Sequence, residues 1–347
     1  MPSLRPLFTA LASILILAGC TSDVVVPDPP KDVIMFVARD PITRVTTFYR
    51  MNIDGTELTA VGPVTAPTKN LIAVTDGGRY LFYSGKSGSD LPLFRFDVSA
   101  TSYTQVSPTS AAFPTPSPNG DRIAWFELNS GRYELIVCSK DGTERITLVD
   151  SALIKASISV QGPPAWSPDG SKICFVATDT TLSGRIASVP FVVTVATRGI
   201  QRFRTRDEVK AAQWLSDDAI VYLWNERSSF VLKRFALSTE REDNVTSTLP
   251  TLNSSVISVS PDHTTIVCVN PMLIVDVATG TFKTIPTNDA VIHERMWSPR
   301  SDEFIYGDRT SASLYSERLF RVSKLGAPLP LPNVDSLGSS ASVVWMR

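Results

Sequence analysis

The segment AWSPDGSKICF at residues 165–175 joins a tryptophan, a tight turn and an apolar strand. Its Ser-Pro-Asp-Gly, residues 167–170, suits a type I turn, since serine favours the first position, proline presets φ at the second and glycine is favoured at the fourth. The strand that follows, from Lys172 to about Ala177, is apolar on both faces. A strand buried on both faces lies in a sheet packed between other sheets.

Variants of this segment recur along most of the chain. Successive copies begin 38 to 50 residues apart, and self-similarity at such a period is typical of propellers and repeat arrays. Each unit also contains a hairpin, for example around Asp141 and Gly142, that supplies a third and a fourth strand. Four such strands make one propeller blade. The residues that begin the copies are Val74, Pro116, Trp166, Trp214, Val259 and Trp297.

The two ends of the chain together complete one further unit. Val33–Arg39 looks like a second strand without its turn, and residues 47–61 supply a third and a fourth strand. The missing first strand is Ala341–Trp345, which ends 48 residues after Trp297. Because closing a ring removes exposed sheet edges, the sequence predicts an all-β propeller of seven blades whose terminal strands share a blade. Six blades are the alternative, if one weak copy is a long insertion.

Ser-Pro-Asp-Gly followed by an apolar strand resembles the WD40-like repeat of the TolB-type propellers. Residues 52–57, Asn-Ile-Asp-Gly-Thr-Glu, are similar to that family's hairpin between the third and fourth strands. The resemblance covers residues 33–347 and implies the fold, but the shared residues shape turns and imply little about function. TolB itself carries an extra N-terminal α/β domain. We expect none here, nor the interactions made through it, because the first strand follows the signal by about a dozen residues.

The first residues resemble a bacterial lipoprotein signal. Arg5 provides a positive charge, and Leu7–Leu17 is an apolar stretch too short to span a bilayer. It runs into Leu-Ala-Gly-Cys at residues 17–20, which resembles a lipobox and implies that Cys20 is acylated. We therefore expect a signal peptide at 1–19 and an anchor of several acyl chains, which holds a membrane stably. The alternative is an ordinary secretory signal that contains a cysteine.

Residues 20–32 form the predicted tether between this anchor and a propeller at 33–347. The tether contains three prolines, which keep it extended over roughly 35 Å. Thr21 and Ser22 follow the cysteine, without an aspartate at its second position, and this resembles the pattern of outer-membrane sorting. The sequence thus predicts a lipid-anchored protein of the bacterial cell envelope, at the outer membrane and facing the periplasm or the cell surface.

Charge and cysteines narrow the classes of partner. The formal net charge is −1 at pH 7, so binding to nucleic acid has no electrostatic support. Besides Cys20 the chain has Cys138, Cys174 and Cys268, all in apolar strands, and an odd number without close spacing argues against a disulfide framework. We expect these three to be small core residues of a monomeric propeller.

Groups suited to catalysis are scarce in the sequence. The chain has 2 histidines and lacks the spaced motifs of zinc, calcium and serine-hydrolase sites. His263 replaces the turn glycine of its copy, which predicts a solvated turn residue, and Asp217 and Asp218 fall in another turn. We therefore expect no catalytic residue, no metal and no cofactor.

A propeller that binds a ligand does so at its central channel and the loops around it. Residues two to four before each copy approach this entrance, and most are apolar, such as Phe113, Pro163 and Val256. The polar exceptions predict a mouth that holds an acidic side chain or a peptide terminus, and the alternative is a local ion pair of little energy. These candidate residues are Asn70, Lys210, His293, Glu294 and Arg295.

Arg202, Arg204 and Arg206 alternate with other residues and so share one face of a predicted outermost strand. They suggest a docking stripe for an anionic surface such as lipid head groups or an acidic partner. The alternative is protection of a sheet edge by charge.

Four of the 6 tryptophans recur at one repeat position, which predicts packing between blades rather than ligand stacking: Trp166, Trp214, Trp297 and Trp345.

The predicted function is a non-enzymatic envelope lipoprotein whose propeller binds a protein or an envelope polymer. Its position would be set by the lipid on Cys20, and recognition by shape and hydrogen bonds at one face of the disc. The alternative is a glycan-binding or glycan-degrading propeller, a lyase or hydrolase, that acts in the central channel. A cluster of titratable groups within hydrogen-bond reach would separate the two.

Overall fold

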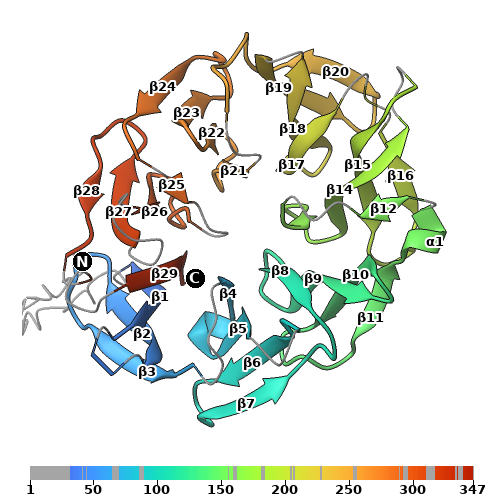
Figure 1. The fold of residues 1–347 in the computed structure, drawn as a ribbon. Coiled ribbons are helices and arrows are strands. Elements are labelled where there is room, and N and C mark those ends of the chain that lie inside the picture. Colours follow the sequence, from blue (N-terminus) through green and yellow to red (C-terminus); the bar gives the residue numbers. More distant parts are fainter. Residues whose placement is uncertain are drawn as a thin grey trace, which may run out of the picture. The chain divides into compact units, whose positions relative to one another are not determined.

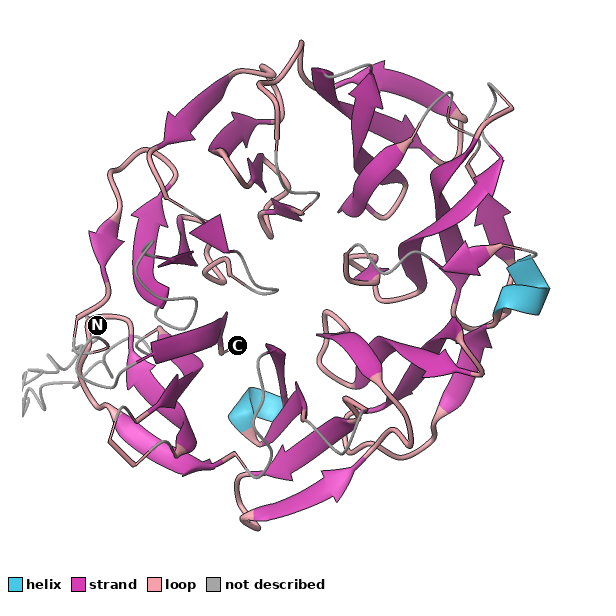
Figure 2. Cartoon of the chain, viewed as in Figure 1, coloured by secondary structure: helices cyan, strands magenta, loops and turns pink. Residues whose placement is uncertain are grey.

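The computed structural model describes residues 32–40, 42–43, 45–64, 70–85, 90–154, 156–158, 162–180, 184–203, 205, 208–226, 229–252, 256–288, 290–291, 296–309, 317–332, 334 and 339–346. These residues form an all-β fold, as predicted, with only the 3-10 turn η1 (Asp76–Gly78) and the single α-helical turn α1 (Ser151–Ile154) between strands (Figure 2). No helix in this part of the chain has the length and apolar character needed to cross a bilayer.

Within this part of the chain, seven antiparallel blades of four strands follow one another around a ring (Figure 1). The prediction of seven blades is confirmed, and the six-bladed alternative is wrong. From the innermost strand outwards, blade 1 contains β29 (Ser339–Trp345), β1 (Val33–Arg39), β2 (Thr46–Asn52) and β3 (Thr59–Pro63), and blade 2 contains β4 (Asn70–Thr75), β5 (Tyr80–Ser84), β6 (Leu93–Asp97) and β7 (Ser102–Gln105). Blade 3 contains β8 (Ala111–Pro116), β9 (Arg122–Asn129), β10 (Arg132–Ser139) and β11 (Ile146–Val149). Blade 4 contains β12 (Ser157–Ile158) with β13 (Ala165–Trp166), then β14 (Lys172–Thr180), β15 (Ile186–Thr194) and β16 (Ile200–Arg202).

The remaining three blades repeat the same order. Blade 5 contains β17 (Val209–Ser216), β18 (Ala219–Glu226), β19 (Ser229–Ala236) and β20 (Arg241–Asn244). Blade 6 contains β21 (Ile257–Val259), β22 (Thr265–Cys268), β23 (Met272–Asp276) and β24 (Phe282–Ile285). Blade 7 contains β25 (Ala290–Val291), β26 (Glu303–Arg309), β27 (Glu317–Ser323) and β28 (Leu329–Pro330).

The ring closes through the two ends of the chain. β29 pairs antiparallel with β1, so that Trp345 lies opposite Ile34, and it forms the innermost strand of blade 1 (Figure 1). This is the shared blade that the sequence predicts. A single pair of residues, Glu317 and Ser340, also joins β27 to β29, so blades 7 and 1 form one continuous sheet. Pairing of the two ends removes an edge that would otherwise be free.

The Ser-Pro turns have the geometry predicted from their residues. The Gly170 N–H donates to the Ser167 carbonyl over 2.8 Å, as in a type I turn, and Gly170 has φ +71°, which suits glycine. The Ser167 hydroxyl donates to Asp169 Oδ1 over 2.6 Å and accepts the Lys172 N–H over 2.9 Å. Burial opposes ionisation of Asp169, but bonds from Ser167 and Ser171 outweigh it and lower its pKa to about 2.

Strand β14 shows why its sequence is apolar on both faces. Ile173 and Phe175 belong to a core that blade 4 shares with blade 3, including Phe126. Cys174, on the other face, belongs to a core shared with blade 5, including Tyr222. Every blade is packed in this way between its neighbours, so alternate residues of one strand enter two different cores.

The three described cysteines are small core residues, as predicted. Cys138, Cys174 and Cys268 are buried and form no disulfide. Burial raises the pKa of the Cys138 and Cys268 thiols to about 12, and also raises that of Cys174. A thiol with so high a pKa is unreactive at neutral pH, because the thiolate is the nucleophile.

The repeated tryptophans are buried between blades, as predicted, with exposed fractions of 8% or less. Three of them also donate their indole N–H to a carbonyl of the preceding blade: Trp166 to Thr115 over 3.0 Å, Trp214 to Ala165 over 2.8 Å and Trp345 to Met296 over 2.7 Å. In each case the acceptor comes just before the residue that begins the preceding copy. The recurrence of tryptophan thus has a structural cause at the blade junctions.

Candidate binding site in the central channel

A cavity of about 370 Å³ lies where the Ser-Pro turns of blades 3, 4 and 6 meet the inner strands of the ring. This volume is within the usual range of ligand pockets. The wall comes from five consecutive blades, and the described lining residues are Phe113, Thr115, Pro116, Pro118, Pro163, Pro164, Ala165, Trp166, Pro168, Gln213, Trp214, Val256, Ile257, Ser258, Val259, Ser260, Pro261, His263 and Trp297.

The wall of this cavity is apolar and rich in proline. Six of its described residues are prolines, four are large aromatics, and none carries a carboxylate, ammonium or guanidinium group. Proline has no N–H to donate, so these positions offer apolar surface without competing donors. An uncharged group fits such a wall, because a charged group would lose its hydration there without gaining a partner.

The turn serines at this wall are engaged in the turns themselves. The Ser260 hydroxyl donates to Asp262 Oδ1 over 2.6 Å and accepts the Thr265 N–H over 3.0 Å. Ser167, which precedes the wall residue Pro168 but does not itself line the cavity, is bonded in the same way. A nucleophilic serine instead needs an adjacent general base, and among the described residues these hydroxyls contact only turn groups.

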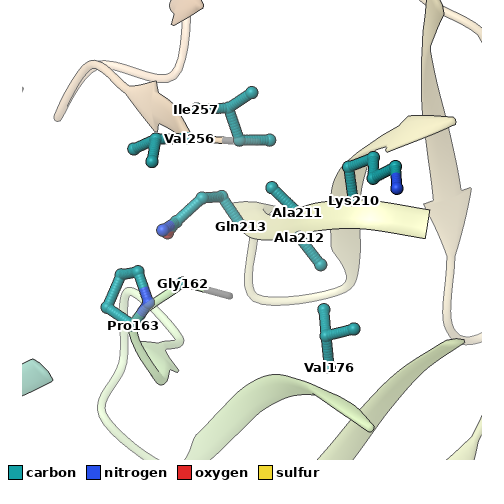
Figure 3. Close-up of a pocket in the computed structure, with 9 residues that line it drawn as sticks. All are labelled: Gly162, Pro163, Val176, Lys210, Ala211, Ala212, Gln213, Val256 and Ile257. Carbon is teal, nitrogen blue, oxygen red and sulfur yellow. The ribbon is translucent and has the colours of Figure 1, made fainter. Parts of the chain in front are cut away.

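A second cavity, of only about 20 Å³, continues from the first along blades 4 to 6 (Figure 3). The two cavities share the wall residues Pro163, Gln213, Val256 and Ile257. In Figure 3 the side chain of Gln213 extends from β17 towards the space between Pro163 and Val256. Gln213 therefore stands where the two cavities meet.

Gln213 is the most versatile polar group in this wall. Its side chain is half-buried, and its amide makes no hydrogen bond with any described residue. The primary amide offers two N–H donors and one carbonyl acceptor from a single planar group. It can therefore satisfy a ligand group that both donates and accepts a hydrogen bond.

His263 differs from its sequence prediction. It occupies the turn position held elsewhere by glycine and has φ +59°, but its side chain is half-buried and lines the cavity. The turn position is as predicted, but the residue is half-buried rather than fully solvated. Burial lowers the pKa of His263, and the charges of Asp262 and Asp217 oppose that shift only in part. Its Nδ1 is buried with no hydrogen-bond partner among the described residues.

Trp297 is the exception among the junction tryptophans. Its exposed fraction is 4%, and it lines the cavity, yet its indole N–H has no acceptor within the described chain. By the repeat, its acceptor would be the carbonyl of Ser258 in blade 6, just before Val259. Blades 6 and 7 thus meet without the hydrogen bond found at three other junctions.

The predicted polar mouth is described only in part. Lys210 lies at the small cavity, where its Nζ is 2.7 Å from Glu208 Oε2, so its charge is already paired locally (Figure 3). Asn70 begins β4, but its side chain is not described. His293, Glu294 and Arg295 lie outside the described residues, as does Cys20. That these groups bind a ligand stays a prediction.

The arginine stripe is also described only at its first residue. Arg202 ends β16, the outermost strand of blade 4, as predicted. Its Nε is 2.7 Å from Asp179 Oδ2, an ion pair within the same blade. Arg204 and Arg206 lie outside the described residues. A docking role for the stripe stays a prediction.

The residues that the sequence reading missed are the apolar ones. In the sequence, Pro163 and Val256 are apolar residues near the expected entrance and carry no predicted role, whereas in the structure they form the wall together with Ile257. The sequence pattern does not single out Gln213, because it directly precedes Trp214, whereas the expected entrance residues lie two to four positions before each copy. A polar residue at that offset, where another blade has Ala165, was the available signal.

Among the described residues, no group of three or more His, Cys, Asp or Glu side chains could hold a metal ion.

Comparison with known proteins places the fold. No protein-family model matches the chain, and no curated protein matches it. TolB from Acinetobacter baumannii is similar, with a TM-score of 0.52, 18% identity, and coverage of 91% of this chain and 66% of that one. The chain has a TolB-like propeller fold.

Other solved structures share this TolB-like fold at low identity. Puromycin hydrolase matches with a TM-score of 0.63 and 14% identity over 90% of this chain and 53% of that one. A 6-phosphogluconolactonase described as putative, from Bacteroides fragilis NCTC 9343, matches with a TM-score of 0.56 and 14% identity over 92% and 99%. The chain spans just under two thirds of the TolB structure and about half of the puromycin hydrolase.

Proposed function

We propose that this protein is a non-enzymatic binding scaffold of the bacterial cell envelope. A lipid on Cys20 holds it at a membrane, residues 20–32 act as the tether, and the propeller binds a partner protein at the channel cavity beside the Ser-Pro turns. The observation that carries the proposal is the cavity of about 370 Å³, whose described wall is built of proline and buried aromatic residues without charge.

Two further features support a binding role. Blades 3 to 6 are packed against one another by a separate core at each interface, and the wall residues stand on inner strands joined to those cores, so the cavity is preformed. A preformed site loses little conformational entropy on binding. In addition, the Ser260 hydroxyl at the cavity holds its turn together.

The test is a substitution that fills the cavity. Val256 is half-buried and lines both cavities, so Val256→Trp places a large ring where the partner would sit. We expect cross-linking and capture from native membranes to recover a protein with the wild-type chain and at least tenfold less with V256W. In the same fractions Cys20→Ser should move the protein from membrane to supernatant.

The matched control is Ile186→Trp, which adds the same ring at a position that is 79% exposed at the start of β15. It should capture as much partner as the wild type. Equal capture by V256W and I186W would refute a site in the channel. Retention of C20S in the membrane would refute the lipid anchor.

A glycan-binding or glycan-degrading propeller is the alternative. Propeller structures similar to this one are named as hydrolases as well as TolB, so the fold does not decide between the two roles. The buried tryptophans favour the scaffold, because sugar stacking uses exposed aromatic faces. Release of reducing ends from envelope polysaccharide by the wild type, and not by V256W, would favour the enzyme.

A further inference from the structure

On the basis of the binding role proposed above, on which it rests, we propose that Gln213 recognises the main chain of an extended, uncharged segment of the partner. The half-buried amide of Gln213 projects between Pro163 and Val256 at the meeting point of the two cavities (Figure 3). A peptide group carries one N–H and one carbonyl, and the glutamine amide pairs with both at once.

The residues around Gln213 determine which partner side chains fit on either side of that peptide group. Pro163, Pro164, Val256 and Ile257 present apolar surface on both sides of the amide. Extended proline-rich segments present mainly apolar surface, and their conformation is already ordered before binding. Apolar or prolyl side chains therefore fit on either side of the paired peptide group.

A sugar fits this wall less well. Trp166, Trp214 and Trp297 are at most 8% exposed, so their ring faces are covered by neighbouring blades. The indole N–H groups of Trp166 and Trp214 are also bonded to carbonyls of the preceding blade. The polar groups that remain for a ligand are few and uncharged, as recognition of a main chain requires.

The rim next to Gln213 adds a preference of charge. β17 leads from Gln213 to Asp217 and Asp218, which are both exposed. Asp217 and Asp262 both act electrostatically on His263, which lines the cavity, but Asp262 is itself paired with Lys324, whose Nζ is 2.7 Å from its Oδ2. Asp217 therefore supplies the exposed carboxylate at this rim. Asp217 also accepts the Asp169 N–H over 2.9 Å, which holds its carboxylate in place. A lysine or arginine beside the uncharged segment can pair with the carboxylate of Asp217.

The experiment uses a random library of linear dodecapeptides selected on the purified full chain, followed by calorimetry with the selected peptides. We expect sequences with an apolar or prolyl core beside a basic residue. Gln213→Ala and Gln213→Glu should weaken binding at least tenfold, since each removes an amide donor. Asp217→Asn, which keeps an oxygen acceptor for Asp169, should weaken binding about threefold by loss of charge. Gln201→Ala on β16 is the matched control and should bind as the wild type does.

An N-methyl scan of the best peptide separates direct pairing from a change in fold. N-methylation at one position should weaken binding to the wild type at least tenfold and should not weaken binding to Q213A any further. Peptides that bind Q213A as tightly as the wild type would overturn the role of Gln213 and leave the proposed scaffold intact. Failure of V256W to reduce capture of the native partner would instead overturn the scaffold. Selection of no peptide at all, with V256W still blocking capture, would overturn the peptide class alone.

Discussion

The junction between blades 4 and 5 and the junction between blades 6 and 7 use the same residue with different results. At the first, Trp214 is 3% exposed and donates its N–H to the Ala165 carbonyl over 2.8 Å. At the second, Trp297 is 4% exposed, but its N–H has no partner in the described chain. Equal burial therefore does not mean equal stabilisation, because a buried donor without an acceptor keeps its cost of desolvation.

The difference has a second part at the turns. Blade 4 has Gly170 at the left-handed turn position with φ +71°, whereas blade 6 has His263 there with φ +59°. The histidine ring lies at the cavity wall, near the face that Trp297 also lines. Two unpartnered polar atoms, His263 Nδ1 and Trp297 Nε1, thus belong to this one sector. These two buried atoms keep their cost of desolvation, so we expect this sector to be less well stabilised than the junction between blades 4 and 5.

The largest loss of stability is expected at the junction between blades 7 and 1, where the tryptophan hydrogen bond is present. Trp345 is 1% exposed, donates to the Met296 carbonyl and stands in the strand that closes the ring. Trp345→Ala removes that bond and leaves a large hole, and should lower the free energy of unfolding by about 3–5 kcal/mol. Urea unfolding followed by circular dichroism measures this loss. A loss below about 1 kcal/mol would mean that blade 1 holds without its terminal strand.

A matched pair of variants tests the comparison itself. Trp214→Phe and Trp297→Phe remove the same atoms from the same repeat position, but only W214F leaves a carbonyl without its donor. W214F should therefore be more destabilising than W297F by about 1 kcal/mol. The measurement is the urea midpoint of each variant relative to the wild type. Equal midpoints would show that Trp297 has an acceptor in solution.

The smallest expected effect is a pH dependence at His263. Its pKa in the folded protein is lowered from 6.5 by burial, with Asp262 and Asp217 opposing. His263 then binds a proton more readily in the unfolded chain than in the folded protein. The free energy of unfolding is therefore highest above pH 6.5 and falls as the pH drops below that value. Unfolding measured from pH 7.5 to 5 should show this fall, within the pH range of an unperturbed histidine.

His263→Asn supplies the control for this dependence. Asparagine tolerates a positive φ and does not titrate, so H263N should keep the turn and flatten the slope. The second histidine, His293, is present in both proteins and cancels in the comparison. An unchanged slope in H263N would assign the dependence to another group.

Much of the fold could be predicted from the sequence because its signals are local. Ser-Pro-Asp-Gly specifies a turn within four residues, and an apolar run such as that of β14 reveals burial on both faces. Trp345 could be paired with Val33–Arg39 because a first strand was missing at one end and present at the other. The site was harder, since a cavity depends on how neighbouring blades are tilted, and no local pattern reports that angle.

By itself, the sequence determined the repeat, the blade count, the shared terminal blade and the buried tryptophans, since turn preference and strand alternation act between residues close in the chain. Only the tertiary structure decided that Gln213 meets Pro163 and Val256 at one cavity, and that Trp297 has no acceptor among the described residues for the bond its counterparts make. These facts depend on distances between different blades. A hydrogen bond is made or lost over less than 1 Å, which is finer than any sequence pattern specifies.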